Sequence, residues 1–431
     1  MKRTHYTNEL TKAIGKEVVV AGWVFDCRLL GGINFLLLRD KDGLVQVTAH
    51  KDKVSADIFK AYEKLHQEDV ISIKGRIVKS TKTKSGVELI PSEIELINKS
   101  QTPLPLDPRE VTKANLNTQL DWRFLYFRTK EAKAIFKIQT IVLKSFRNFF
   151  LDRGYMELQA PVIISSASEG GAELFTMPYF EKQAFLAQSP QLYKQMGAMS
   201  FEKVFMVVPV FRAEKFDQPT HLNEIRQMDI EQAFSTDEDV MKVLEEAFLH
   251  ILRQVSEECE DELKVLSREL KIPKLPLKRI TYTHAIELLK KNKEKIEWGE
   301  DFSKTQEKLL TKLVGEHTYF VKDWPTAIKA FYAFPYEDNP KICKAFDLIY
   351  DGIEVCSGTQ RIHIPELLIK QLKSKGLNPD NFKYYVDAFR YGSAEHSGFS
   401  IGLERLTMEI CGIDNIQKVT MFPRTRNRIT P

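Results

Sequence analysis

Two arginines and three acidic residues have the chemical character that a reaction on a nucleotide would need, and they occur in a suggestive order along the chain. Arg212 and Glu214 follow an apolar run at 204–211, Asp347 and Glu354 come later, and Arg405 closes a glycine-spaced segment. A guanidinium fork matches two phosphate oxygens, and carboxylates suit hard cations such as Mg²⁺. Together they indicate phosphoryl chemistry in which fixed positive charge and Mg²⁺ stabilise a phosphoryl transition state.

Each of these residues also has a simpler interpretation. Arg212 and Glu214 could form a surface ion pair, and Asp347 and Glu354 could be solvated carboxylates. The segment 398–405 could be a turn followed by the start of a helix. The functional interpretation rests on the joint occurrence, with Arg212 held rigidly at the end of a strand and Glu214 projecting from the same strand face.

Composition narrows the class of protein. The chain has 431 residues, 43% hydrophobic and 28% charged, which is ordinary for a globular protein of two or three domains. The apolar runs fall far short of a membrane span, and no apolar run precedes Val18, so we expect no membrane partner and no signal peptide. Five cysteines without metal-ligand spacing predict free thiols and a cytoplasmic location.

Charge is unevenly distributed along the chain. Residues 1–100 hold 17 Lys and Arg against 13 Asp and Glu, and the remainder is balanced at 46 and 46. A basic N-terminal module fits a nucleic-acid partner, and a solvated lysine-rich surface is the alternative.

The N-terminal region predicts a small barrel. Apolar alternation and turn residues predict five strands and one helix, at 18–24, 34–39, 44–48, 54–65 (the helix), 70–78 and 87–97. The segment 81–86 reads as a basic hairpin. This pattern predicts an oligonucleotide-binding (OB) β-barrel over residues 1–102, with an SH3-like barrel as the alternative.

The rest of the chain predicts a second domain. The proline-rich start of 103–130 predicts a linker. Residues 131–431 mix helices and antiparallel strands, which is typical of the α+β class. The predicted helices cover 132–153, 236–257, 302–313 and 364–376, and the predicted strands cover 156–162, 204–211 and 226–234.

Three segments of this second region resemble the signature motifs of class II aminoacyl-tRNA synthetases. Phe146–Pro161 resembles motif 1, Phe211–Glu231 motif 2 and Gly398–Arg405 motif 3. The resemblance implies an antiparallel catalytic sheet flanked by helices and a homodimer formed through motif 1. The N-terminal barrel places the resemblance in the subclass for aspartate, asparagine or lysine, and Gln188–Gln195 with its Lys194 is similar to aspartyl-tRNA synthetases of the archaeal and eukaryotic type.

The resemblance implies roles for individual residues. Arg212 and Arg405 would be catalytic. Aspartate would be bound by Glu169, Gln191, Lys194, Arg212, Asp229, Ser357 and Arg361. ATP would be bound by Arg212, Ala213, Glu214, Thr220, His221, Leu222, Glu354, Gly402, Leu403, Glu404 and Arg405. Mg²⁺ would be held by Asp347, Glu354 and Ser357.

The resemblance also assigns an anticodon surface. Phe35 would stack on the middle anticodon base and Gln46 would pair with it, whereas periodicity alone favours a core position for Phe35. Phe25, Arg28 and Lys84 would surround the base that distinguishes tRNA(Asp) from tRNA(Asn). Some archaeal members carry tryptophan where this chain has Phe25, which favours a relaxed enzyme that charges both tRNAs.

The resemblance implies ATP-dependent attachment of aspartate to tRNA(Asp) through aspartyl-adenylate, with no side-chain nucleophile. One alternative is an asparaginyl-tRNA synthetase, which Lys194 disfavours because a neutral amide gains nothing from a cation. Another is a non-catalytic RNA-binding paralogue, disfavoured by the joint presence of Arg212, Glu354, Arg361 and Arg405. A third is an ammonia-using asparagine synthetase, which has no anticodon barrel.

Overall fold

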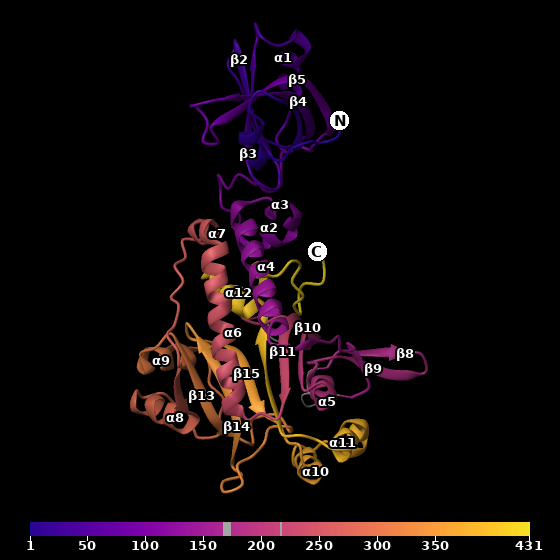
Figure 1. The fold of residues 1–431 in the computed structure, drawn as a ribbon, viewed down its shortest axis with the longest axis vertical. Coiled ribbons are helices and arrows are strands. Elements are labelled where there is room, and N and C mark those ends of the chain that lie inside the picture. The colour runs from indigo at the N-terminus through magenta and orange to yellow at the C-terminus, as the bar shows by residue number, and fades with distance from the viewer. Residues whose placement is uncertain (167–173, 216–217) are drawn as a thin grey trace. The chain divides into compact units, whose positions relative to one another are not determined.

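The computed structural model describes residues 1–166, 174–215 and 218–431 and divides into two compact units, Met1–Ala114 and Asn115–Pro431 (Figure 1). The predicted linker 103–130 is shared between them, with 103–114 in the first unit and 115–130 in the second.

The first unit is a closed five-stranded barrel with strand order β1-β2-β3-β5-β4. Its strands are β1 (Glu17–Leu29), β2 (Ile33–Arg39), β3 (Leu44–His50), β4 (Val70–Lys79) and β5 (Val87–Asn98). Its helices are η1 (Thr7–Ala13), α1 (Ala56–Ala61) and η2 (Tyr62–Lys64). The predicted helix 54–65 is therefore a short α-helix followed by a 3₁₀ turn, and the basic hairpin is the turn between β4 and β5.

The barrel core is built by apolar residues at alternate positions along the strands. In β2, Leu36 and Leu38 are fully buried while Phe35 and Leu37 on the other face are only half-buried. In β3, Val45 and Val47 alternate in the same way. Because successive strand residues point to opposite faces, the buried apolar residues fill the inside of the barrel and the residues between them lie on the outer face.

The second unit is built on an eight-stranded, mainly antiparallel sheet with order β12-β13-β14-β15-β16-β11-β10-β6. Its strands are β6 (Met156–Glu157), β10 (Lys203–Phe211), β11 (Glu224–Ala233), β12 (Lys278–Thr281), β13 (Thr318–Pro325), β14 (Ile342–Tyr350), β15 (Ile353–Gln360) and β16 (His396–Gly402). A smaller sheet, β7-β9-β8, contains β7 (Ile163–Ile164), β8 (Thr176–Tyr179) and β9 (Lys182–Leu186).

Helices flank the large sheet, and α4 (Lys130–Leu151) and α6 (Asp237–Glu258) lie side by side across it (Figure 1). The remaining helices are α2 (Leu116–Asp121), α3 (Arg123–Tyr126), α5 (Gln191–Phe201), α7 (Glu260–Val265), α8 (Tyr282–Lys291), α9 (Lys304–Val314), α10 (Pro365–Ser374), α11 (Lys383–Arg390) and α12 (Leu403–Cys411), with 3₁₀ turns η3 (Pro379–Phe382) and η4 (Ile416–Val419). The predicted helices correspond to α4, α6, α9 and α10 with small boundary shifts.

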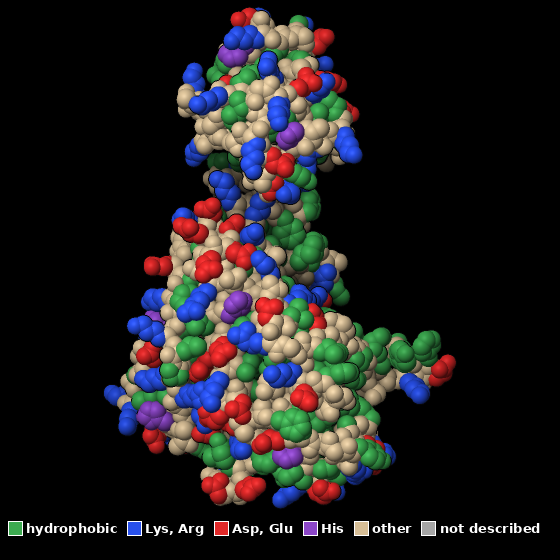
Figure 2. Space-filling model, viewed as in Figure 1, with side chains coloured by type: hydrophobic (Ala, Val, Ile, Leu, Met, Phe, Trp, Pro, Cys, Tyr) green, Lys and Arg blue, Asp and Glu red, His purple; other side chains and the backbone are tan. Residues whose placement is uncertain are grey.

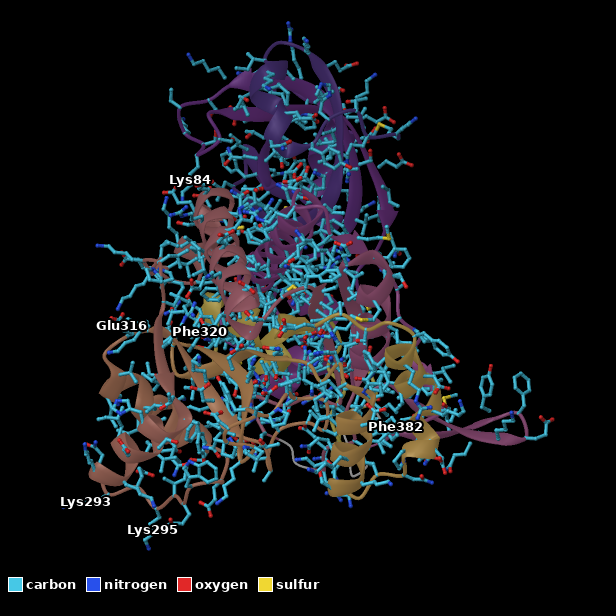
Figure 3. All side chains as sticks on the ribbon, turned by 60° about the horizontal axis from the view of Figure 1, so that its bottom comes forward. Lys84, Lys293, Lys295, Glu316, Phe320 and Phe382 are labelled. Carbon is cyan, nitrogen blue, oxygen red and sulfur yellow. The ribbon has the colours of Figure 1, made fainter. Side chains whose placement is uncertain are left out.

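The second unit has more than one hydrophobic cluster. Phe320 of β13 belongs to the main core, which also contains Phe146 of α4 and Phe248 of α6. Phe382 belongs to a separate cluster around α10 and α11. Figure 3 labels both phenylalanines and shows that they come from different parts of the unit.

The predicted strand 156–162 is wrong beyond Glu157. Only Met156 and Glu157 pair with β10, and one further bond joins the Leu158 N–H to the Phe205 carbonyl. Pro161 lacks the N–H that a ladder needs, and the chain next enters the small sheet as β7. Within the described ranges, no helix has the length and apolarity needed to cross a bilayer.

Candidate active site

Two adjoining cavities open at the middle of the large sheet, and Arg212 and Ser357 line both. The first, about 220 Å³, contains the predicted residues Gln191, Lys194, Arg212, Asp229, Ser357 and Arg361. The second, about 110 Å³, contains the predicted residues Arg212, Glu214, Thr220, His221, Leu222, Glu354, Ser357, Gly402, Glu404 and Arg405. The two predicted binding sets thus occupy neighbouring cavities with one guanidinium at their junction.

Arg212 follows directly after β10, as predicted. The backbone N–H of Arg212 donates to the backbone carbonyl of Asn223 at 2.9 Å. The side-chain amide of Asn223 donates in turn to the backbone carbonyls of Arg212 and Glu214, at 2.7 and 3.1 Å. The expectation that Glu214 continues the same strand face is wrong, because β10 ends at Phe211. Asn223 instead holds the segment so that Glu214 still lines the smaller cavity.

The larger cavity has a floor of paired charges. Lys194 Nζ lies 2.6 Å from Asp229 Oδ1 and 3.6 Å from Glu231 Oε2. Arg361 meets the Glu231 carboxylate through Nε at 2.9 Å and Nη2 at 3.2 Å. All four side chains are at least 96% buried. Buried ions persist when paired and hydrogen-bonded, so each acid holds a cation in place at the cavity wall.

A glycine makes this floor possible. Glu231 of β11 lies directly opposite Gly398 of β16. A Cβ at Gly398 would collide with the Glu231 carboxylate and the Ile230 carbonyl. The glycine predicted to mark motif 3 therefore leaves room for the acid that positions Arg361.

In the smaller cavity, Arg405 of α12 and Glu354 of β15 are adjacent. Arg405 Nη1 donates to the Glu354 carbonyl at 2.9 Å and lies 3.7 Å from the carboxylate. Burial, together with the cations Arg405, Lys304 and Arg212, lowers the pKa of His221 to about 4, so His221 is neutral near pH 7. Burial raises the pKa of Glu404 to about 7, opposed by the Arg226 N–H that this carboxylate accepts.

The acidic residues predicted to hold Mg²⁺ lie on neighbouring strands. Asp347 of β14 is directly opposite Ser357 of β15. Burial raises the pKa of Asp347 to about 6; Lys329, whose Nζ lies 2.6 Å from Oδ2, opposes this and Glu354 adds to it. Although burial favours the neutral acid, Arg405 and Lys329 hold the pKa of Glu354 below its ordinary value.

Some predicted residues lie elsewhere. Ala213 lines a third cavity of about 720 Å³. Leu403 is buried in the main hydrophobic core, and Asp347 is buried and does not itself line either of the two site cavities. Glu169 falls outside the described residues.

Sequence reasoning missed four residues that shape the site. Glu231 could have been found, because it stands two residues after Asp229 on a predicted strand and so shares its face. Gln195 stands four residues after Gln191 on α5, but α5 was not among the predicted helices, so this spacing was not recognised. Lys329 and Asn223 lie outside regular elements and gave no periodic signal.

On the barrel, the predicted anticodon residues are accessible. Phe35 of β2 lies opposite Arg28 of β1 and opposite Thr48 of β3. Gln46 lies opposite Leu37, on the same outer face as Phe35, and donates to Thr48 Oγ1 at 3.2 Å. Phe25 is half-buried near the Arg39 guanidinium, and Lys84 is exposed in the β4–β5 turn (Figure 3). Phe35 is therefore a surface aromatic and not part of the barrel core.

Two family models match this chain. One, described as tRNA synthetases class II (D, K and N), covers residues 115–426, and the other, an OB-fold nucleic acid binding domain, covers 18–97.

Curated relatives match along the whole chain. The aspartate–tRNA(Asp) ligase of Pyrococcus furiosus is 48% identical over 438 residues, covering 100% of both chains. The aspartate–tRNA(Asp/Asn) ligase of Methanothermobacter thermautotrophicus is 44% identical over 433 residues, covering 100% of this chain and 99% of the relative.

Solved structures agree with the fold. The asparaginyl-tRNA synthetase of Pyrococcus horikoshii complexed with asparaginyl-adenylate superimposes with a TM-score of 0.96 at 32% identity, covering 100% of both chains. A putative aspartyl-tRNA synthetase from Leishmania major gives 0.90 at 31% identity, covering 100% of this chain and 95% of that one. The OB barrel and the class II catalytic fold predicted from the sequence are confirmed, and the chain belongs to the class II tRNA synthetases of the D, K and N group.

Proposed function

We propose that this protein attaches L-aspartate to tRNA(Asp), and also to tRNA(Asn), through an aspartyl-adenylate made from ATP. The observation that carries the proposal is the junction of the two cavities at Arg212. One cavity suits a small molecule with an anionic side chain and the other suits a nucleotide. A group that reaches both lies where the amino-acid carboxylate and the α-phosphate must meet.

The larger cavity fits aspartate by charge. Lys194 and Arg361 provide cations for the side-chain carboxylate, with Arg361 using Nε and Nη2 for Glu231 and offering Nη1 to the substrate. Asp229, which also pairs with Lys194, is the acid proposed to hold the α-ammonium group. Glu169 completes this set as a proposal from the family resemblance alone.

Adenylate formation needs no side-chain nucleophile, because the substrate carboxylate attacks the α-phosphorus directly. Arg212 bridges that carboxylate and the phosphate, and Arg405 binds the nucleotide beside Glu354. Neutral His221 adds hydrogen-bonding capacity without repelling the two arginines. Orientation and charge stabilisation account for the rate in this scheme.

The acids also fit Mg²⁺. Asp347 Oδ1 is buried without a hydrogen-bond partner among the described residues, which suits a cation ligand. No group of three His, Cys, Asp or Glu side chains gathers as a metal site in the described ranges. Mg²⁺ is commonly held by one or two carboxylates with phosphate and water completing the shell. Asp347, Glu354 and the Ser357 hydroxyl would hold it, and it would neutralise charge on the polyphosphate.

A homodimer is part of the proposal. The segment resembling motif 1 exposes Leu151 and Met156, and the β8–β9 hairpin exposes Tyr179 and Phe180. Figure 2 shows hydrophobic side chains gathered on this projecting hairpin. Exposed apolar clusters of this kind mark association surfaces, and sedimentation equilibrium of the full chain would give the mass of two copies. All five cysteines are free thiols, which fits action in the cytoplasm.

Asparagine activation is the second candidate, favoured by the close superposition on an asparaginyl-tRNA synthetase. Lys194 opposes it, because a buried cation is stabilised far less by a neutral amide than by a carboxylate. The test is charging of tRNA(Asp) and tRNA(Asn) transcripts with labelled aspartate and with labelled asparagine, with an unrelated tRNA as control. Aspartylation of both is expected. Aspartylation of tRNA(Asp) alone would overturn the relaxed selectivity, and asparaginylation or no charging would overturn the proposal.

A further inference from the structure

A chain of hydrogen bonds runs behind the larger cavity, from β16 to the first turn of α5. His396 Nδ1 lies 2.9 Å from the Ala394 carbonyl oxygen, and His396 Nε2 lies 2.8 Å from Gln195 Nε2. Gln195 Oε1 accepts from Gln191 Nε2 at 2.8 Å and from the Tyr385 hydroxyl at 2.8 Å. His396, Gln195 and Tyr385 are fully buried, and Gln191 is 4% exposed and lines the cavity.

The direction of this chain is fixed at its inner end. A backbone carbonyl can only accept, so His396 Nδ1 must carry a hydrogen. The ring of His396 stacks on Phe389 at 5.6 Å, which holds its plane. Burial lowers the pKa of His396 to about 4, so the ring is neutral near pH 7 and Nε2 is an acceptor.

The remaining orientations follow in order. Because His396 Nε2 accepts, the NH₂ group of Gln195 must face it, and Gln195 Oε1 must face the other way. That oxygen then requires donors, which are the Tyr385 hydroxyl and the NH₂ group of Gln191. With its nitrogen directed at Gln195, the amide of Gln191 presents its oxygen on its other side.

We propose that Gln195 and His396 are positioning residues that orient the Gln191 amide so that its oxygen faces the amino-acid cavity and accepts a hydrogen bond from the substrate's α-ammonium group. This inference rests on the proposed function. The cations Lys194, Arg212 and Arg361 in the same cavity suit the two carboxylates of aspartate. The ammonium group requires acceptors, and an outward NH₂ on Gln191 would oppose it.

Two substitutions test this chain of hydrogen bonds. Gln195→Met removes the oxygen that holds Gln191 and keeps the side chain's length, and His396→Leu removes the acceptor that orients Gln195. Each is expected to raise the KM for aspartate in pyrophosphate exchange about tenfold, the loss expected of one charged hydrogen bond, while kcat changes less than about twofold. The inhibition constant of succinate, which lacks the ammonium group, should stay unchanged.

Tyr385→Phe is the matched control. It removes the other donor to the same Gln195 oxygen and leaves the Gln191 bond in place, so the KM for aspartate should stay within about twofold. A parallel rise in the aspartate KM and the succinate inhibition constant would overturn the inference, because it would indicate general damage to the cavity. Unchanged aspartate KM in both variants would overturn it too.

Neutron diffraction of the unaltered protein, exchanged into deuterated buffer, tests the chain of hydrogen bonds without any variant. Deuterium is expected on His396 Nδ1 and on the Gln191 nitrogen that faces Gln195. A Gln191 amide with its nitrogen turned to the cavity would contradict the inference. This readout stands apart from the proposed function, whose own failure would appear as absence of aspartate activation by the unaltered protein.

Discussion

The carboxylate of Glu231 holds the guanidinium of Arg361 through two hydrogen bonds, at 2.9 and 3.2 Å, with both side chains at least 96% buried. Glu231 is on β11, Arg361 follows directly after β15, and Lys194 of α5 approaches the same carboxylate. One acid therefore positions both cations that are proposed to bind the aspartate side chain.

Glu231→Gln should destabilise the protein strongly. The substitution keeps the side-chain volume but removes the negative charge that Lys194 and Arg361 share. Breaking a buried ion pair by removing one partner costs about 3–5 kcal/mol. Urea unfolding followed by circular dichroism measures the loss. Glu246→Gln is the control: it breaks the half-exposed Arg153–Glu246 pair and should cost less than about 1 kcal/mol. Equal effects of the two substitutions would contradict the account.

Gly398→Ala should disturb the same group of paired charges through a steric clash. The added methyl group would collide with the Glu231 carboxylate and the Ile230 carbonyl, so the unfolding free energy should fall by about 1–3 kcal/mol, as for other overpacked sites. In Gly402→Ala the nearest atom to the added methyl is Arg405 Cβ at 3.7 Å, an ordinary contact. That substitution should leave thermal stability nearly unchanged, and a comparable loss in both would contradict this role of Gly398.

Arg212→Lys should slow adenylate formation. Lysine keeps the charge but loses the fork that can reach the carboxylate and the α-phosphate together. Loss of one preorganised donor typically lowers kcat about 10²- to 10³-fold, which pre-steady-state pyrophosphate release would measure. Arg226→Lys on neighbouring β11, where the side chain pairs with half-exposed Glu224, should keep kcat within a few-fold. Similar rates for Arg212→Lys and the unaltered protein would rule out the junction role.

Acid should destabilise the protein in a pH window set by His221 and His396. Unfolded histidine takes up a proton near pH 6.5, whereas the folded pKa of His221 is lowered to about 4. Between these values the unfolded state binds more protons, so the unfolding free energy falls as pH drops from 6.5 towards 4. His396 contributes in the same sense.

His221→Gln removes one share of this dependence. Its unfolding free energy should decline less steeply between pH 6.5 and 4, measured by urea titration without ligands, while its difference from the unaltered protein stays constant above pH 7. A slope identical to that of the unaltered protein would show that His221 titrates normally.

Phe35→Ala should weaken tRNA use alone. Stacking of one base on an aromatic side chain contributes about 1–3 kcal/mol, so the KM for tRNA(Asp) should rise by roughly tenfold or more. Aspartate-dependent pyrophosphate exchange, which needs no tRNA, should not change. Substitution of Leu36, the fully buried neighbour, should instead destabilise the barrel. A loss of exchange activity in Phe35→Ala would contradict its assignment to the anticodon surface.

Local patterns predicted the barrel strands and the helices α4, α6, α9 and α10 of the second unit. Alternation in β2 and β3 and the 3.6-residue period of α4 and α6 are properties of short segments, and they were read correctly. The motif residues Arg212, Glu354 and Arg405 were brought together as expected. Phe35 shows the limit of periodicity, which favoured a core position for a residue that lies on the outer face.

Contacts between distant segments were not predictable in this way. Glu231 meets Arg361, 130 residues later, and Gln195 meets His396, 201 residues later. No local pattern encodes such a pair, because both partners are buried polar residues whose energies depend on tertiary placement. The prediction of a strand over 156–162 was wrong for a related reason. The length of a strand depends on the neighbouring strand with which it pairs, and only Met156 and Glu157 pair with β10 in the large sheet.

The most direct test of the account is exchange of labelled pyrophosphate into ATP, driven by aspartate or by asparagine at equal concentration, with purified full-length protein and Mg²⁺. Cations buried for a carboxylate predict exchange with aspartate at least about a hundredfold more efficient than with asparagine. Exchange driven equally well by asparagine, or by neither amino acid, would contradict the roles of Lys194 and Arg361 on which the account depends.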